Sequence, residues 1–269
     1  MIKMAVGLKW QILLKVLPYA LLFCLAKFLV HRMGWEIGTF DPQTSSVFGA
    51  ITLVIAFVLA GTLSDFKASE ALPLEICSAV EGMNDTNTLI AASTSDYNPQ
   101  PLLESLIVTL ETIRHWLLQS GDTAIVFDQI TELNQKLVPL NRFTPPPLMS
   151  KVQAELAKLR LAVMRIRVIR DTDFVISAYT LLELYTVGAV LALILVGGEH
   201  FGRNLMLSVI LVTGIFYLLL LIRDLDNPFQ YNGESSVDVT LQDLDFTLDR
   251  LRNQLHKPPF KNSDAGSNR

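Results

Sequence analysis

The chain has 269 residues, of which 51% are hydrophobic and only 18% are charged. Its mean hydropathy of +0.39 excludes an ordinary water-soluble globular protein and indicates a membrane protein. A net charge of −4 offers no basic surface for nucleic acid, and two cysteines are too few for a disulfide scaffold or a zinc site of ordinary spacing. We therefore expect no nucleic-acid partner. The four histidines are scattered, and there is no phosphate-binding glycine loop, no G-x-S-x-G motif and no H-E-x-x-H motif, so we also expect no metal site, no cofactor and no catalytic residue.

Four mostly apolar segments are long enough to cross a bilayer, whose hydrocarbon core of about 30 Å needs about 20 helical residues. These predicted spans are residues 12–30, 47–63, 174–196 and 205–222. The spans pair into two transmembrane hairpins, residues 12–63 and 174–222. The first span is expected to be retained rather than cleaved as a signal peptide, because His31-Arg32-Met33 is not a small-residue cleavage site.

Positive charge predicts the orientation of the spans. The two short connections, residues 31–46 and 197–204, hold only Arg32 and Arg203, whereas the termini and the central region hold many more Lys and Arg residues. Cytoplasmic loops are the ones enriched in Lys and Arg. We therefore expect a multi-pass protein of the cell (inner) membrane, with both termini and residues 64–173 in the cytoplasm.

Helical periodicity runs through the central region, so residues 64–173 are predicted to form a helical cytoplasmic domain. Residues 101–118, 122–137 and 148–170 each read as a helix, with Asp122 as the N-cap of the second. Residues 84–98, rich in Asn, Thr, Ser and Asp, are predicted to be a loop. The third helix is expected to run directly into the span at 174–196. Its apolar residues repeat at the spacing of a helix–helix contact: Val152, Leu156, Leu159, Val163 and Ile166.

The region after the last span, residues 223–256, is predicted to be a cytoplasmic turn followed by one helix, and residues 257–269 a disordered tail. Asp238 and Thr240 are candidate N-caps of that helix. Its leucines indicate either self-association as a zipper or packing against the central helices, and the shortness of the repeat favours packing. These leucines are Leu241, Leu244, Leu248, Leu251 and Leu255.

Charged residues inside the spans are costly and often functional. Glu183, in the third span, and Lys15, in the first, lie at depths that allow an ion pair. Such a pair indicates either a gate or ion site, or a purely structural contact, and Glu183 is simply interfacial if the third span begins near Tyr179. Lys27 lies near the outer end of its span, where we expect it to snorkel to the membrane surface.

The second span is the candidate pore helix. It carries no charge, and Gly49, Leu53, Phe57 and Gly61 are spaced by four and lie near one helical face. In a symmetric ring of subunits this face would line a narrow apolar neck. The alternative, more common for small residues, is that they permit close packing of helices.

A sharp turn is predicted directly after the last span, at Asp226-Asn227-Pro228-Phe229, because Pro228 ends the helix and disfavours helical geometry at Asn227. This turn places carboxylates at the cytoplasmic edge of the membrane, where they can meet cations or arginines.

Taken together, the two paired spans, the helical insert between them and the Asn227-Pro228-Phe229 turn resemble the bestrophin-like membrane family, in its poorly characterised branch related to bestrophin anion channels. A second span that continues into the polar residues 64–71 also resembles that family. The resemblance implies a homopentamer whose second span lines the pore, with Leu53 and Phe57 in an apolar neck and Gly49 one turn above.

The sequence also departs from that family. Gln230-Tyr231-Asn232-Gly233-Glu234 stands where bestrophins carry a run of acids, which argues against a calcium clasp. Asp65 stands where bacterial members carry a basic residue, so cation passage is as arguable as anion passage.

These observations predict an all-α, four-span integral membrane protein with a helical cytoplasmic domain. The predicted function is passive conduction of ions, chloride or another anion by the resemblance, through a homo-oligomeric pore in the lipid bilayer. The alternative is a non-conducting scaffold or signalling protein. An intramembrane enzyme has little support, because Glu183 is the only candidate for a buried catalytic group.

Overall fold

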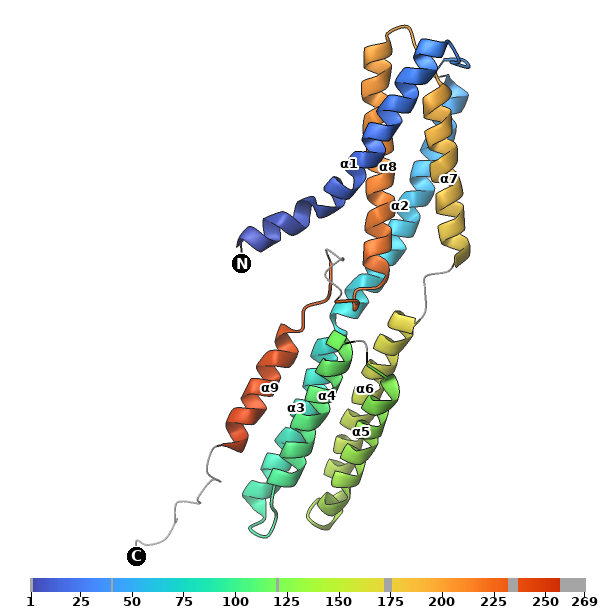
Figure 1. Cartoon of the computed structure of the whole chain (residues 1–269). Coiled ribbons are helices and arrows are strands. Elements are labelled where there is room, and N and C mark those ends of the chain that lie inside the picture. The colour runs from blue at the N-terminus through green and yellow to red at the C-terminus, as the bar shows by residue number, and fades with distance from the viewer. Residues whose placement is uncertain (1, 40, 120, 172–175, 232–236, 257–269) are drawn as a thin grey trace, which may run out of the picture. The chain divides into compact units, whose positions relative to one another are not determined.

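The computed structural model describes residues 2–39, 41–119, 121–171, 176–231 and 237–256. Within these residues every regular element is helical, and a single isolated backbone bridge joins Thr39 and Gly197 (Figure 1). The chain divides into two compact units. Unit 1 comprises the described residues of 1–67, 172–228 and 232–238, and unit 2 those of 68–171, 229–231 and 239–269.

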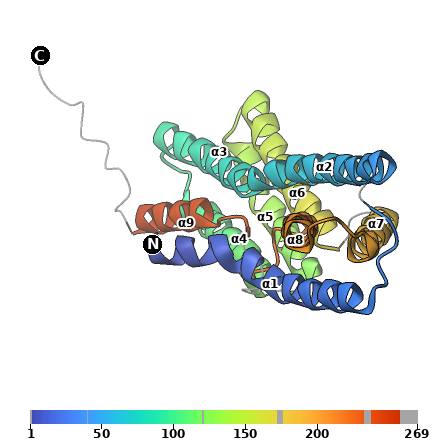
Figure 2. The same ribbon diagram turned by 90° about the horizontal axis from the view of Figure 1, so that it is seen from above.

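Unit 1 contains the apolar helices. They are α1 (Ile2–Met33), α2 (Pro42–Glu70, whose last three residues belong to unit 2), α7 (Ile176–Leu195) and α8 (Phe201–Asp226). Among the described residues, α1, α2 and α8 contain stretches long and apolar enough to cross a membrane, and the searched part of α7 is a shorter apolar helix. Viewed from above, α8 lies between α1 and α2 (Figure 2). The prediction of four apolar helices in an all-α membrane protein is confirmed.

The end of α1 shows how local sequence fixes the first hairpin. Gly34 follows the helix with a φ of +71°, a left-handed conformation that glycine adopts without strain. The Trp35 N–H donates to the Val30 carbonyl, and the Gly34 N–H to that of His31, both at 3.1 Å. These two bonds form a Schellman motif, which ends the helix and redirects the chain.

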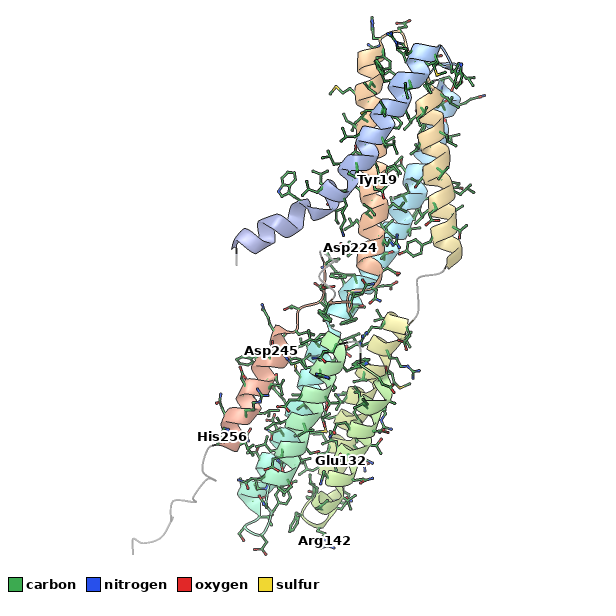
Figure 3. All side chains as sticks on the ribbon, viewed as in Figure 1. Tyr19, Glu132, Arg142, Asp224, Asp245 and His256 are labelled. Atoms are coloured by element: carbon green, nitrogen blue, oxygen red, sulfur yellow. The ribbon has the colours of Figure 1, made fainter. Side chains whose placement is uncertain are left out.

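An apolar cluster holds the four helices of unit 1 together. Tyr19 of α1 also stacks on Phe216 of α8, with ring centroids 5.1 Å apart (Figure 3). Aromatic stacking adds about 0.5–1.5 kcal/mol to simple burial. The buried members of the cluster are Phe23, Phe48, Ile51, Ile55, Leu182, Ala189, Leu193, Val212, Ile215 and Ile222.

Unit 2 is a helical bundle. Its helices are α3 (Leu72–Ser93), α4 (Gln100–Gln119), α5 (Thr123–Lys136), the 3₁₀ helix η1 (Val138–Arg142), α6 (Pro146–Asp171) and α9 (Gln242–Leu255). Helix α3 packs mainly on α6, α4 packs on α5, and α9 packs on both α3 and α4. The heptad-spaced residues predicted from Val152 to Ile166 are all buried, as expected for a helix–helix seam.

One predicted loop is wrong over most of its length. Residues 84–93, expected to be irregular because of their polar composition, continue α3 as far as Ser93. Asn87 is buried and donates through Nδ2 to the Pro99 carbonyl at 2.9 Å, while its Oδ1 accepts from the Tyr97 hydroxyl at 2.6 Å. Tertiary hydrogen bonds therefore satisfy the polar side chain within a helix, which composition alone does not reveal.

Helix α9 begins one position later than a Thr240 cap requires and three positions later than an Asp238 cap requires. Its N-cap is Leu241, without a side-chain cap, so Asp238 and Thr240 are not the N-cap. Leu244, Leu248 and Leu251 are buried, and α9 contacts α3 and α4, so its leucines pack within the chain as favoured. The predicted junction between α6 and the third span includes residues 172–175, and the predicted tail is residues 257–269; both lie outside the described residues.

Candidate pore-lining helix

Helix α2 has two faces of different character. One face carries Phe48, Ile51 and Ile55, which are buried in the apolar cluster of unit 1. These residues repeat at the three- and four-residue spacing of one helical side. The side that packs within the chain is therefore bulky and aliphatic or aromatic.

The opposite face carries the four residues predicted from the sequence, and all of them are exposed. Leu53 is 57% exposed and Phe57 is 70% exposed. A Cβ atom added at Gly49 or Gly61 would meet no heavy atom within 4 Å. In the described chain these glycines do not serve close packing between its own helices, the more common role for small residues in membrane helices.

This exposed face also differs from the exposed faces of the other helices of unit 1. Around Leu53 and Phe57 it is built largely from small residues, Ala56 and Ala60 among them. The other helices present large apolar side chains, which are suited to lipid. Those side chains include Leu14, Leu17 and Leu21 on α1, Leu184, Val187 and Leu191 on α7, and Met206, Leu207 and Ile210 on α8.

We name this face the α2 stripe and define it as the exposed residues that share one side of the helix. With about 100° per residue, Asp65 lies roughly 120° around the helix from the centre of the stripe, whereas Lys67 lies on it. The stripe thus has small or polar residues at both ends, an apolar centre and one cation. Its members are Ser46, Gly49, Leu53, Ala56, Phe57, Ala60, Gly61, Ser64 and Lys67.

The two charged residues predicted to pair in the membrane lie on the surface of unit 1. Glu183 is exposed on α7 and Lys15 is exposed on α1. Their interaction remains a prediction. Among the described residues, no group of three or more His, Cys, Asp or Glu side chains is placed to hold a metal ion.

Lys27 lies in an environment that differs from the predicted one. It does not snorkel: its side chain is fully buried, and Nζ donates to the Leu193 carbonyl at 2.5 Å and the Val196 carbonyl at 2.9 Å. The carbonyls at the end of a helix have no partner within the helix, and a lysine from another helix can satisfy them. The burial of Lys27 could have been predicted from the sequence, because Lys27 continues a row of apolar residues at helical spacing. The buried members of this row are Ile12, Val16, Ala20 and Phe23.

Backbone pairing strengthens the same end of unit 1. The Ile37 N–H donates to the Leu195 carbonyl and the Gly197 N–H to the Gly38 carbonyl, both at 2.9 Å. A Cβ atom at Gly197 would lie 2.7 Å from a carboxylate oxygen of Glu36, so only glycine fits this approach without movement. The ends of α1 and α7 are therefore held together by backbone and side-chain hydrogen bonds.

The predicted turn follows α8, which ends at Asp226, with Asn227 as its C-cap in a non-helical conformation. Phe229 is fully buried. The geometry agrees with the expected effect of Pro228 on the residue before it. Any role of this turn beyond the change of chain direction remains a prediction.

No protein-family model and no curated protein sequence matches the chain. Solved structures do match it. A variant of a bacterial bestrophin homologue from Klebsiella pneumoniae superposes with a TM-score of 0.72 at 14% identity, over 92% of this chain and 98% of that one. A second variant gives a TM-score of 0.71 at 15% identity, over 93% and 98% of the two chains.

The chain has a bestrophin-like fold. A third variant of the Klebsiella homologue supports the same conclusion, with a TM-score of 0.72 at 15% identity over 88% of this chain and 97% of that one. The resemblance seen in the sequence is thus confirmed for the fold and for a membrane protein. At such low identity, the bestrophin-like fold does not by itself assign a role to any side chain.

Proposed function

We propose that this protein is an ion channel, in which several copies surround one axis and each contributes its α2 stripe to the pore wall. The main support for this proposal is that Leu53 and Phe57 are exposed, on the side of α2 that has no partner helix in the described chain. A scaffold that uses this stripe for packing within its own subunit would bury it. Apolar side chains at a constriction can gate ion flow by excluding water.

The small residues of the stripe support the same proposal. An aliphatic surface is suited to lipid, whereas Gly49 and Gly61 leave space beside Leu53 and Phe57. In a ring of subunits the glycines would widen the path above and below the neck. The pore would thus be narrow over only a short part of its length, which keeps the barrier to ions local.

We propose that the permeant ions are anions, chloride among them, because the charged residue at one end of the stripe is a cation. Lys67 lies about 40° around the helix from Leu53, whereas Asp65 lies about 120° from it; both lie about 80° from Phe57. A ring of lysines at the mouth of a pore attracts anions and raises their local concentration. The orientation proposed from positive charge puts unit 2 and both termini in the cytoplasm.

The first experiment is electron microscopy of the purified full chain in nanodiscs, viewed along the symmetry axis. The proposal expects a ring with α2 innermost. A monomer, or a ring with another helix innermost, would refute it. A matching anion-flux assay in liposomes tests whether the assembly conducts.

Phe57→Ala tests the neck directly. Removing the ring widens the constriction and lowers the barrier to water and ions, so we expect single-channel conductance to rise several-fold in planar bilayers. The matched control is Leu207→Ala, which shortens a similarly exposed side chain on α8. Equal conductances for the two variants would remove Phe57 from the pore.

The Lys67→Glu substitution tests the proposed ion selectivity. Reversal of the charge at the mouth is expected to shift the reversal potential in a KCl gradient toward that of cations. Lys136→Glu, the same change at the exposed end of α5, serves as the control and should leave the reversal potential unchanged. A Lys67 variant with unaltered anion preference would contradict the assigned selectivity.

A further inference from the structure

Helix α6 carries a second apolar seam that faces solvent in unit 2. We name it the α6 face. Leu161 is 49% exposed, Met164 49% and Val168 59%, and they repeat at helical spacing opposite the buried seam of the same helix. Exposed apolar positions in such a row mark an interaction surface more often than isolated ones do. The full α6 face is Ala154, Ala157, Leu161, Met164 and Val168.

The α6 face is bordered by positive charge. Between residues 157 and 170 the helix carries no acidic residue. Arg160 is exposed on the border of the face and forms no ion pair within the described part of the chain. A surface with an apolar row beside a cation is complementary to a partner surface that has apolar side chains and negative charge. Of the other basic residues in this stretch, Lys158, Arg165 and Arg167 form ion pairs with Glu155, Glu75 and Asp171, and Arg170 lies over the Trp116 ring on the opposite side of the helix.

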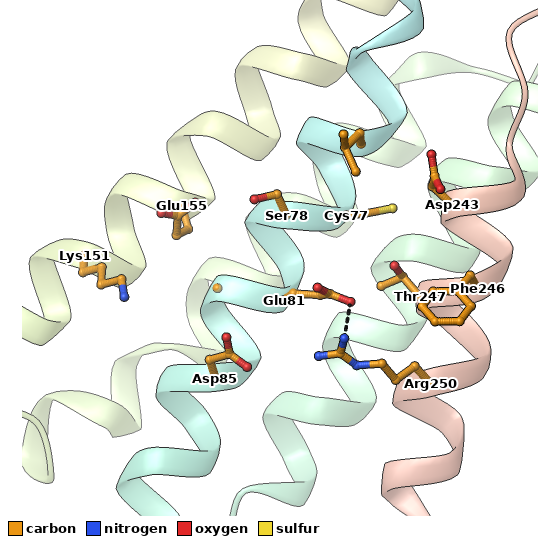
Figure 4. Close-up of a pocket in the computed structure, with 12 residues that line it drawn as sticks. Cys77, Ser78, Glu81, Asp85, Lys151, Glu155, Asp243, Phe246, Thr247 and Arg250 are labelled. Atoms are coloured by element: carbon orange, nitrogen blue, oxygen red, sulfur yellow. Dashed lines mark ion pairs between the residues drawn. The ribbon is translucent and has the colours of Figure 1, made fainter.

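A groove of the opposite character lies on another side of unit 2. It has a volume of about 570 Å³ and runs along α3, between α6 and α9 (Figure 4). Leu74 and Phe246 line it and are 58% and 67% exposed, so the groove also offers apolar contacts. Its charged lining residues are the acids Glu81, Asp85, Glu155 and Asp243 and the bases Lys151 and Arg250.

The negative charge of this groove is only partly neutralised within the chain. Glu81 pairs with Arg250 at 3.2 Å and Glu155 with Lys158 at 2.9 Å. Asp85 and Asp243 have no ion pair among the described residues and are exposed. These two carboxylates therefore remain available to a partner that brings cations.

We propose that the α6 face of one copy docks into the α3–α9 groove of the next copy. The inference rests on the proposed ring and names the surfaces of unit 2 that would join its subunits. The occupant is a second copy, because the same chain supplies both an apolar row bordered by arginine and a groove that combines apolar walls with unpaired carboxylates. Arg160 would lie opposite Asp85 or Asp243, and Leu161 and Met164 would contact Phe246.

The geometry of the two surfaces determines the kind of assembly. Glu155 and Lys151 line the groove from α6, but they lie about 100° or more around the helix from the α6 face. The two surfaces are thus different patches on different sides of unit 2. A contact between unlike patches is heterologous, so repeating it gives a ring when its rotation closes and an open filament when it does not, but not a two-fold dimer.

Charge exchange tests the pairing in the full-length protein. Asp85→Lys combined with Asp243→Lys is expected to convert rings into single chains in mass photometry. Adding Arg160→Asp to that variant is expected to restore rings in part. The control Asp128→Lys/Glu132→Lys makes the same total charge change on exposed positions of α5, where Figure 3 labels Glu132, and should leave rings intact.

Cross-linking tests the contact itself. In a background in which Cys24 and Cys77 are replaced by alanine, Met164→Cys and Phe246→Cys together should give a ladder of covalent oligomers on oxidation. Each single cysteine variant should remain a single chain. Dimers alone would contradict a heterologous contact.

The outcomes separate this inference from the proposed function. Rings that persist in the charge-reversed protein and fail to cross-link would refute the α6-face contact and leave the channel proposal standing. A wild-type protein that forms no ring refutes both. The Arg160→Asp variant alone gives one more outcome. If its rings stay intact but it no longer binds vesicles that contain phosphatidylserine, the basic border binds lipid and the inference is overturned.

Discussion

At the scale of single residues, burial distinguishes two lysines that look alike in the sequence. Lys15 is exposed on α1, whereas Lys27 is fully buried and donates hydrogen bonds to two carbonyls at the end of α7. Both lie within the same predicted span. Only the register of the buried positions of α1 separates them, so a residue's depth alone led to the wrong interpretation of Lys27.

Lys27→Met is expected to destabilise unit 1. The substitution keeps the length of the side chain but removes the donor, so the Leu193 carbonyl loses its bond to Nζ, while Asn204 Nδ2 still donates to Val196 at 3.0 Å. Hydrogen bonds from charged groups contribute about 1.5–3 kcal/mol. We expect a lower midpoint of thermal unfolding in detergent, and Arg203→Met, at an exposed position of α8, should as the matched control unfold near the wild-type temperature.

Tyr97 makes the stability of unit 2 depend on pH. Burial raises the pKa of Tyr97 from 10.0 to about 12. The unfolded chain therefore releases this proton before the folded chain does, so the contribution of Tyr97 is fully present below pH 10 and is lost as the pH rises toward 12. The free energy of unfolding should fall by an amount on the order of 2 kcal/mol across this window.

Urea unfolding at several pH values measures this effect. Tyr97→Phe should remove that part of the decrease, although it also removes the bond to Asn87 and lowers stability at neutral pH. Tyr19→Phe should retain the full decrease. An unchanged pH profile in Tyr97→Phe would show that another group causes the loss.

At the scale of elements, local signals predicted helix ends when a side chain itself makes the cap. Asp122 accepts a hydrogen bond from the Ala124 N–H at 2.9 Å and begins α5, as predicted. Asp122→Ala should cost about 1 kcal/mol of stability in thermal or urea unfolding. Asp128→Ala, on the exposed side of the same helix, should change stability by less than about 0.5 kcal/mol.

Long-range contacts explain what the sequence did not predict at this scale. Asn84 and Asn87 suggested a loop, yet both lie buried in α3, where Asn84 Nδ2 donates to Gln254 at 2.8 Å from the far end of the chain. Lys27 finds its acceptors more than 160 residues away. Apolar periodicity identified the helices because packing selects it locally, whereas the partners of buried polar groups are fixed only when the chain has folded.

The candidate pore-lining residues could also be predicted from a local pattern in the sequence. Gly49, Leu53, Phe57 and Gly61 were selected by spacing and composition, and all four lie on one exposed face. The sequence alone did not reveal that this face lacks a partner in the described chain. Lys67 belongs to the stripe because α2 continues to Glu70, in agreement with the expected continuation of the second span into residues 64–71.

At the scale of the whole molecule, the proposed orientation leads to a labelling prediction. Glu199 and Arg142 are both exposed, in unit 1 and unit 2 respectively. In a background without Cys24 and Cys77, Glu199→Cys should react with a membrane-impermeant maleimide in intact cells. Arg142→Cys (Figure 3) should react only after the membrane is opened, and the reverse pattern would invert the topology.

The length of α2 has a mechanical consequence. Its 29 residues extend about 44 Å at 1.5 Å per residue, which exceeds the hydrocarbon thickness of about 30 Å. Phe57 and Lys67 are carried on this one continuous helix, so a rotation about its axis turns both by the same angle. In the proposed channel the neck and the charged mouth would therefore move as one rigid rod, and a stimulus that opens the gate through such a rotation would also change which ions pass.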